Sequence, residues 1–123
     1  MTQSRVLFFG LAVAYLGGVI VQFFLAGLGS FAATGYDPHR ALGLILALVS
    51  LVLVVLAFAG KVPRALHGFA LLLLGLNVLQ IVLVQIDVPE IAALHVVNAL
   101  VIAYVAVEIA ERSRRYLTAK LGT

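Results

Sequence analysis

Apolar residues run along this chain in four long stretches, separated by short segments that carry charge, proline or glycine. The four stretches cover residues 6–28, 39–59, 65–86 and 91–110. A helix of about 20 apolar residues crosses the hydrocarbon core of a bilayer, so each stretch predicts a transmembrane helix. Because the connecting segments are short, we expect antiparallel neighbours in an all-α four-helix transmembrane bundle, with residues 1–123 forming a single membrane domain.

Composition supports a lipid environment. Of the 123 residues, 64% are hydrophobic and 11% are charged, whereas soluble domains carry about 25% charged residues. The chain has no cysteine, which excludes disulfides, thiolate metal sites and covalently attached c-type heme. Its net charge of +3 comes from residues at the helix ends, so we expect the lipid bilayer as its partner and no nucleic acid.

The basic residues also predict an orientation. Seven of the eight fall on one side of the predicted bundle, namely Arg5, Lys61, Arg64, Arg112, Arg114, Arg115 and Lys120. Arg40 lies on the other side, together with Asp37, Asp87 and Glu90. Positive charge is retained on the cytoplasmic face. We therefore predict a multi-pass protein of the cytoplasmic (bacterial inner) membrane with both termini in the cytoplasm.

The two halves of the chain resemble each other. Gln22 lies near the outer end of the first predicted helix, and His39 opens the second helix 17 residues later. Gln80 and His95 have the same places in the second half, 15 residues apart. This repeat predicts two pseudo-symmetric helical hairpins related by an axis along the membrane normal. His39 and His95 should then lie at the same membrane face.

Polar side chains inside a membrane are candidates for function, and here they gather toward the extracytoplasmic side: Gln22, Asn77, Gln80, Gln85, His95 and Asn98. Imidazole is an axial ligand of heme iron, so His39 and His95 could ligate one b-type heme between facing helices. Arg40 could reach a heme propionate, and Asn98, Gln22 or Gln80 could orient an imidazole. Each amide could equally serve only helix packing.

Three further expectations concern the ends of the predicted helices. If the second and fourth helices begin at the same level after Pro38 and Pro89, the two histidines differ in depth by about 7 Å. His67 follows a basic loop and is expected to face lipid headgroups. Glu108 and Arg112 are four residues apart, which predicts a surface ion pair.

Short motifs around the histidines resemble a known family. Residues 37–43 read DPHRALG, residues 79–83 read LQIVL, and residues 93–100 read ALHVVNAL. Together they resemble one four-helix half of heme A synthase, and also small uncharacterised bacterial four-helix membrane proteins. The resemblance covers most of the chain. In heme A synthase each half is a four-helix bundle with a histidine at the outer end of its second and fourth helices, so the resemblance implies heme binding by His39 and His95.

Two departures from the heme A synthase pattern argue against its reaction. That family has a catalytic glutamate one helical turn before the histidine of the second helix, and Gly35 stands at the matching position here. The extracytoplasmic cysteine pair of many members is missing, since the chain has no cysteine. We therefore expect no independent catalytic activity.

The leading hypothesis is a small membrane protein that holds one heme b for electron transfer or heme handling. Its protein partner would be a larger membrane oxidoreductase or a second copy of the chain. A cofactor-free accessory or structural membrane subunit is one alternative. The other is a protein that binds a quinone or another lipid-like ligand in the polar cluster.

Overall fold

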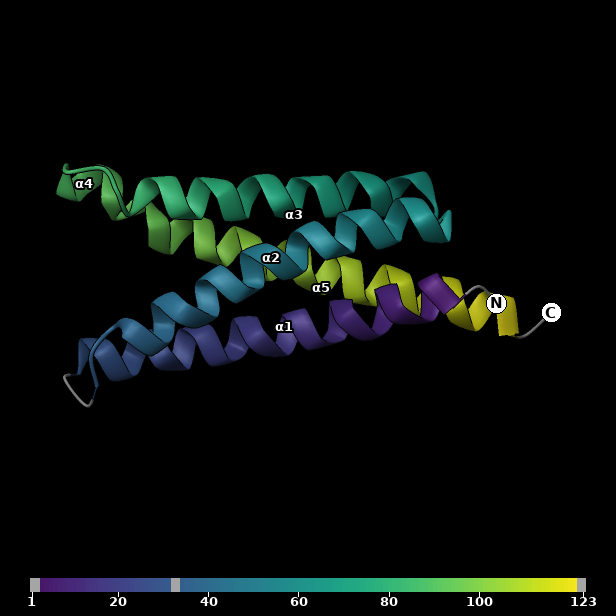
Figure 1. Cartoon of the computed structure of the whole chain (residues 1–123), viewed down its shortest axis with the longest axis horizontal. Coiled ribbons are helices and arrows are strands. Elements are labelled where there is room, and N and C mark those ends of the chain that lie inside the picture. The colour runs from purple at the N-terminus through teal and green to yellow at the C-terminus, as the bar shows by residue number, and fades with distance from the viewer. Residues whose placement is uncertain (1–2, 32–33, 122–123) are drawn as a thin grey trace.

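The computed structural model describes residues 3–31 and 34–121. These residues form helices without any strand: α1 (Gln3–Ser30), α2 (Asp37–Gly60), α3 (Arg64–Leu83), α4 (Pro89–Ala92) and α5 (Leu94–Leu121). The four long helices form a ring in which α1 and α3 each pack against both α2 and α5. Successive long helices run in opposite directions (Figure 1). The prediction of an all-α four-helix bundle is confirmed.

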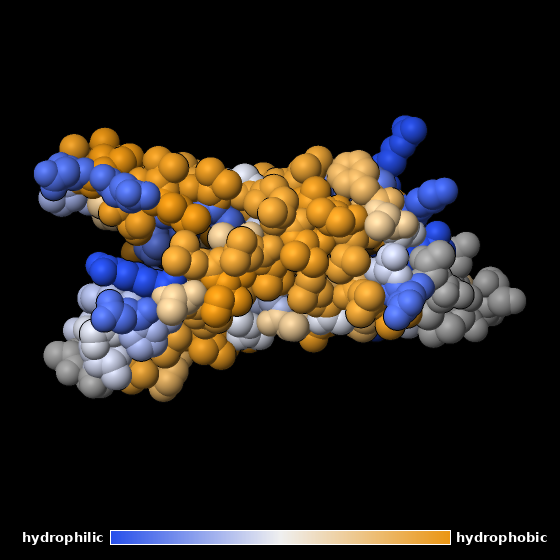
Figure 2. All heavy atoms as spheres, viewed as in Figure 1, coloured by the Kyte–Doolittle hydropathy of each residue, from blue (hydrophilic) through white to orange (hydrophobic). Residues whose placement is uncertain are grey.

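The surface of the bundle suits a bilayer. Each of the four long helices is long and apolar enough to cross a membrane, the last of them taken together with α4. Large apolar side chains are exposed along all four, and they form a hydrophobic band between two hydrophilic ends (Figure 2). The chain is therefore a multi-pass membrane protein whose flanks contact lipid.

Buried positions repeat between the two hairpins, which are α1 with α2 and α3 with α4 and α5. Four buried residues of α1 recur in α3 after 58 positions: Phe8, Ala12, Tyr15 and Val19 correspond to Leu66, Ala70, Leu73 and Asn77. Four buried residues of α2 recur in α5 after 56 positions: Leu46, Ser50, Leu53 and Ala57 correspond to Ile102, Ala106, Ile109 and Ser113. The same core is thus built twice, and the predicted hairpin repeat is present in the packing.

The helix ends differ from the predicted ones in three places. The predicted fourth helix is broken after Ala92, so that α4 is one separate turn. α5 continues to Leu121 instead of ending at residue 110, because ion pairs from Glu111 to Arg114 and Arg115 support further helical turns. α3 ends at Leu83, three residues early, where the backbone closes into short turns.

The end of α2 is held by two side chains from other helices. Lys61 adopts a left-handed conformation with φ of 48° and ends the helix. Arg5 of α1 donates from Nε to the carbonyl of Gly60 at 2.8 Å. His67 of α3 bonds through Nε2 to the carbonyl of Ala57 at 2.9 Å and stacks on Phe58. His67 is half-buried and joins two helices, which differs from the predicted role at lipid headgroups.

Two adjacent glycines of α1 give a matched test of this packing. A Cβ at Gly18 would lie 2.7 Å from Cδ2 of Leu46 on α2, whereas a Cβ at Gly17 would meet no atom of another described helix within 4 Å. Gly18→Leu should therefore destabilise the protein by about 1–3 kcal/mol through overpacking. Gly17→Leu makes the same chemical change on the lipid side and should have little effect. Thermal unfolding in detergent, followed by circular dichroism, compares them. Equal midpoints for the two variants would contradict the packing of α1 on α2.

Candidate functional site

A cavity of about 650 Å³ opens between the two hairpins. It lies at the end of the bundle where α2 and α5 begin, called here the histidine end. Figure 2 shows the bundle forked at this end, with hydrophilic atoms inside the fork. The lining follows the internal repeat in these pairs: Val19 and Asn77, Gln22 and Gln80, Phe23 and Ile81, Ala26 and Val84, His39 and His95, Arg40 and Val96, Gly43 and Ala99, Leu46 and Ile102. The cavity is therefore a cleft with two related walls.

His39 and His95 face each other across this cleft. Their ring centroids are 6.0 Å apart, and the ring planes meet at 64°. The difference in depth of about 7 Å that a common helix start implies is absent, because the break after α4 makes His95 the second residue of α5. His39 is correspondingly the third residue of α2. The structure thus brings together two imidazoles that are 56 residues apart in sequence.

Each histidine is tied to the glutamine of its own hairpin by a reciprocal pair of hydrogen bonds. In the first hairpin, Gln22 Nε2 donates to the His39 carbonyl at 2.7 Å, and His39 Nδ1 lies 3.1 Å from the Gln22 carbonyl. In the second, Gln80 Nε2 donates to the His95 carbonyl at 3.1 Å, and His95 Nδ1 lies 3.5 Å from the Gln80 carbonyl. Since a carbonyl only accepts, Nδ1 carries the proton in each ring and Nε2 keeps its lone pair.

The two glutamines differ in their remaining contacts. Gln80 Nε2 also lies 3.2 Å from His95 Nε2. Its Oε1 accepts a hydrogen bond from Asn98, which also donates to the Leu76 carbonyl at 2.9 Å. Leu42 occupies the position of Asn98 in the first hairpin, and it has no donor to offer Gln22. Among the described residues, Gln22 Oε1 is the buried side-chain atom left without a hydrogen-bond partner.

Arg40 stands at the mouth of the cleft. Its side chain is 77% exposed, and it lies 3.9 Å from Asp37, which is also exposed. Its counterpart on the other wall is Val96. Positive charge at the mouth thus comes from one wall, and this exposed pair leaves the long Arg40 side chain free to turn toward an anionic group.

The floor of the cleft contains a polar contact that the sequence did not single out. Tyr15 of α1 is buried, and its hydroxyl accepts a hydrogen bond from Asn77 Nδ2 of α3 at 2.8 Å. Asn77 also donates to the Leu73 carbonyl. Asn77 was one of the polar residues expected in the membrane, but Tyr15 was overlooked. A hydroxyl in the middle of an otherwise apolar helix is the signal that marks it.

Five of the six predicted site residues line the cleft, namely Gln22, His39, Arg40, Gln80 and His95. Asn98 lies behind Gln80 and is 7% exposed. Across the part of the chain that the structure describes, no group of three or more His, Cys, Asp or Glu side chains is placed to hold a metal ion. The chemistry that the cleft offers is therefore two imidazole nitrogens and several amides in an apolar setting.

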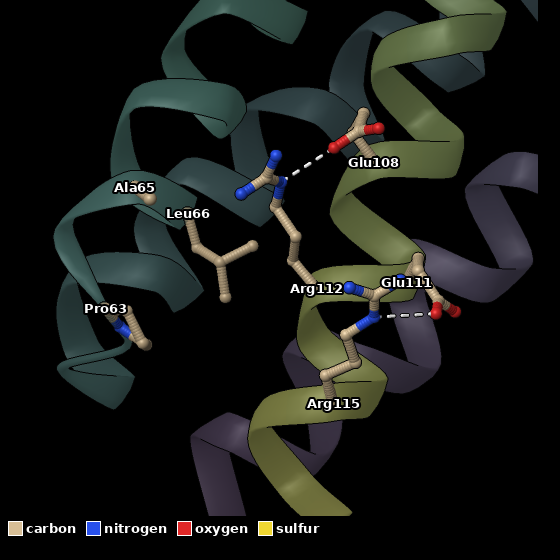
Figure 3. A pocket seen from close by; sticks show the side chains of 7 residues that line it. All are labelled: Pro63, Ala65, Leu66, Glu108, Glu111, Arg112 and Arg115. Carbon is tan, nitrogen blue, oxygen red and sulfur yellow. Dashed lines mark hydrogen bonds and ion pairs between the residues drawn. The ribbon is translucent and has the colours of Figure 1, made fainter.

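A second hollow, of about 370 Å³, lies at the opposite end of the bundle between the start of α3 and α5. Figure 3 shows Arg112 paired with Glu108 and Arg115 paired with Glu111 along its α5 wall. The predicted pair of Glu108 and Arg112 is thus present. These charges neutralise one another at the surface, where such pairs are worth about 0.2–1 kcal/mol, so this hollow is not the candidate site.

The contact between Tyr15 and Asn77 should hold α1 to α3 below the cleft. We expect Tyr15→Phe and Asn77→Leu each to destabilise the protein, with a coupling energy of about 0.6–1.7 kcal/mol in a double-mutant cycle, because a hydrogen bond between helices is lost. Unfolding in mixed detergent measures it. Tyr104→Phe is the control, since that side chain is 64% exposed and should not couple to Asn77. Additive effects of Tyr15→Phe and Asn77→Leu would show that the hydrogen bond does not form.

Comparison with known proteins gives one finding. A family model described as a family of unknown function (DUF6220) matches residues 22–86. No curated protein matches the chain, and no solved structure matches it. The matched region begins at Gln22 and includes His39 and Gln80. It spans more than half of the 123 residues, so the chain belongs to the family of unknown function DUF6220.

Proposed function

We propose that this chain binds one heme b in the cleft through His39 and His95, and that it serves electron transfer or heme handling in the cytoplasmic membrane. The observation that carries the proposal is the 6.0 Å separation of the two imidazole rings. Metal–imidazole bonds are about 2.0–2.1 Å long, so two imidazoles on opposite sides of one metal ion have ring centroids about 6 Å apart. Two histidines suffice because a porphyrin brings the other ligands of its iron.

The rest of the cleft fits such a group. Its volume of about 650 Å³ lies within the range of about 300–1,000 Å³ typical of cofactor sites. Gly43 and Ala99 follow the histidines by one helical turn, line the two walls and leave room for a flat ring. The likeness of residues 37–43 and 93–100 to the histidine motifs of heme A synthase points to the same ligand.

The polar groups of the cleft have distinct tasks in this proposal. The Gln22 and Gln80 carbonyls keep the proton on Nδ1 of each histidine and orient the rings, so that Nε2 is the ligating atom. Arg40 at the mouth would pair with a propionate. Heme b supplies an iron that is reduced and reoxidised by one electron. The apolar walls exclude water from it, which leaves the chain to hold and insulate the group.

The absorption spectrum tests this proposal. Protein purified in detergent from heme-replete cells should show a Soret band, and His39→Ala and His95→Ala should each abolish or shift it by removing a ligand. His67→Ala is the matched control: His67 bonds to Ala57 at the other end of the bundle, so its loss should leave the band unchanged. A colourless wild-type protein, or a band indifferent to all three substitutions, would refute heme binding.

A quinol is the second candidate ligand. It is favoured by the buried Gln22 Oε1, which has no partner among the described residues, because a quinol hydroxyl would donate to it and heme b has no corresponding hydroxyl. His39 Nε2 is a further acceptor in the same cleft. A colourless preparation whose organic extract contains a quinone would support this candidate in place of heme.

We also propose that the histidine end faces away from the cytoplasm, because seven of the eight basic residues belong to the other end. The absence of cysteine allows a direct test with single substitutions. Thr34→Cys, in the exposed connection between α1 and α2, should react with a membrane-impermeant maleimide in cells whose outer membrane has been opened. Thr118→Cys on α5 should react only after the cytoplasmic membrane is broken. The opposite pattern would reverse the orientation.

A further inference from the structure

We propose that the two histidines are unequal ligands: His39 is the permanent one, and His95 is exchangeable because Gln80, positioned by Asn98, competes for the nitrogen that binds iron. The position that His95 vacates would accept a small neutral diatomic molecule. This inference rests on the proposed heme site and concerns its regulation and ligand class.

The competing contact is between Gln80 Nε2 and His95 Nε2, which are 3.2 Å apart. Because His95 Nδ1 is engaged with the Gln80 carbonyl, Nε2 is the nitrogen that carries the lone pair. The same lone pair can thus bind iron or accept a hydrogen bond from Gln80, but not both. When His95 leaves the iron, this hydrogen bond compensates for part of the lost bond.

The orientation of the Gln80 amide follows from its neighbours. The Leu76 carbonyl can only accept, so the Asn98 atom beside it at 2.9 Å is the amide nitrogen. That nitrogen also faces Gln80, so the Gln80 atom that meets it is the oxygen. The Gln80 nitrogen is therefore turned toward His95. Asn98 is 7% exposed and so fixes this arrangement from inside the bundle.

The first hairpin provides the comparison within the same molecule. Gln22 Nε2 donates to the His39 carbonyl at 2.7 Å, and the described contacts of Gln22 include none with His39 Nε2. Leu42 occupies the position equivalent to Asn98, and Gln22 Oε1 lacks a donor. His39 therefore has no competing hydrogen bond that would favour its release. The two walls of the cleft share their ligands and differ in what holds the amide.

Uptake of carbon monoxide by the reduced, heme-loaded protein tests the inference. At saturating carbon monoxide the rate reports how fast a histidine leaves the iron. Asn98→Leu gives the second hairpin the residue of the first, so uptake should slow about three- to tenfold, as expected for one lost hydrogen bond. Leu42→Asn gives the first hairpin a donor for Gln22 and should speed uptake. It carries the test alone if Asn98→Leu does not fold.

A second readout needs no heme. In the heme-free protein, the ¹⁵N resonances of the two Nε2 atoms should differ, since His95 accepts a hydrogen bond there, and Asn98→Leu should make them alike. Equal uptake rates for wild type and Asn98→Leu, or a Soret band with no uptake at all, overturn this inference and leave heme binding intact. Wild-type protein without a Soret band overturns heme binding and this inference together.

Discussion

The reciprocal hydrogen bonds between glutamine and histidine are the interaction on which the site depends. Inside a bilayer no water satisfies a polar side chain, so each must find its partner within the protein. Gln22 with His39, and Gln80 with His95, meet this requirement across the two helices of each hairpin. The same bonds fix the register of those helices, the tautomer of each ring and the height at which both imidazoles enter the cleft.

The rest of the molecule repeats around this pairing, and its exceptions gather at the cleft. Most buried positions of α1 and α2 have an apolar or small counterpart in α3 and α5. The counterparts that change chemistry are Val19 and Asn77, Tyr15 and Leu73, Leu42 and Asn98, and Arg40 and Val96. All four pairs contribute to the cleft or to the residues directly behind it. Departures from an otherwise consistent pattern are expected where function outweighs regular packing.

Much of this arrangement follows from the sequence. Apolar length predicts the four helices, and the repeated spacing from glutamine to histidine predicts that the two rings share one end of the bundle. The sequence could not show the break after Ala92, because residues 91–110 are uniformly apolar and helix-compatible, and that break is what brings His95 level with His39. Nor could it show that His67 meets the Ala57 carbonyl, or that Gln80 reaches a ring nitrogen while Gln22 does not. These contacts depend on how helices distant in sequence cross.

The central claim is that His39 and His95 hold one iron between them. Electron paramagnetic resonance of the oxidised protein at low temperature tests it most directly, since it reports the ligands of the iron itself. The account predicts a low-spin ferric signal typical of two imidazole ligands, converted to a high-spin signal by His95→Ala. A wild-type protein with only a high-spin signal, or with no heme signal at all, would contradict it.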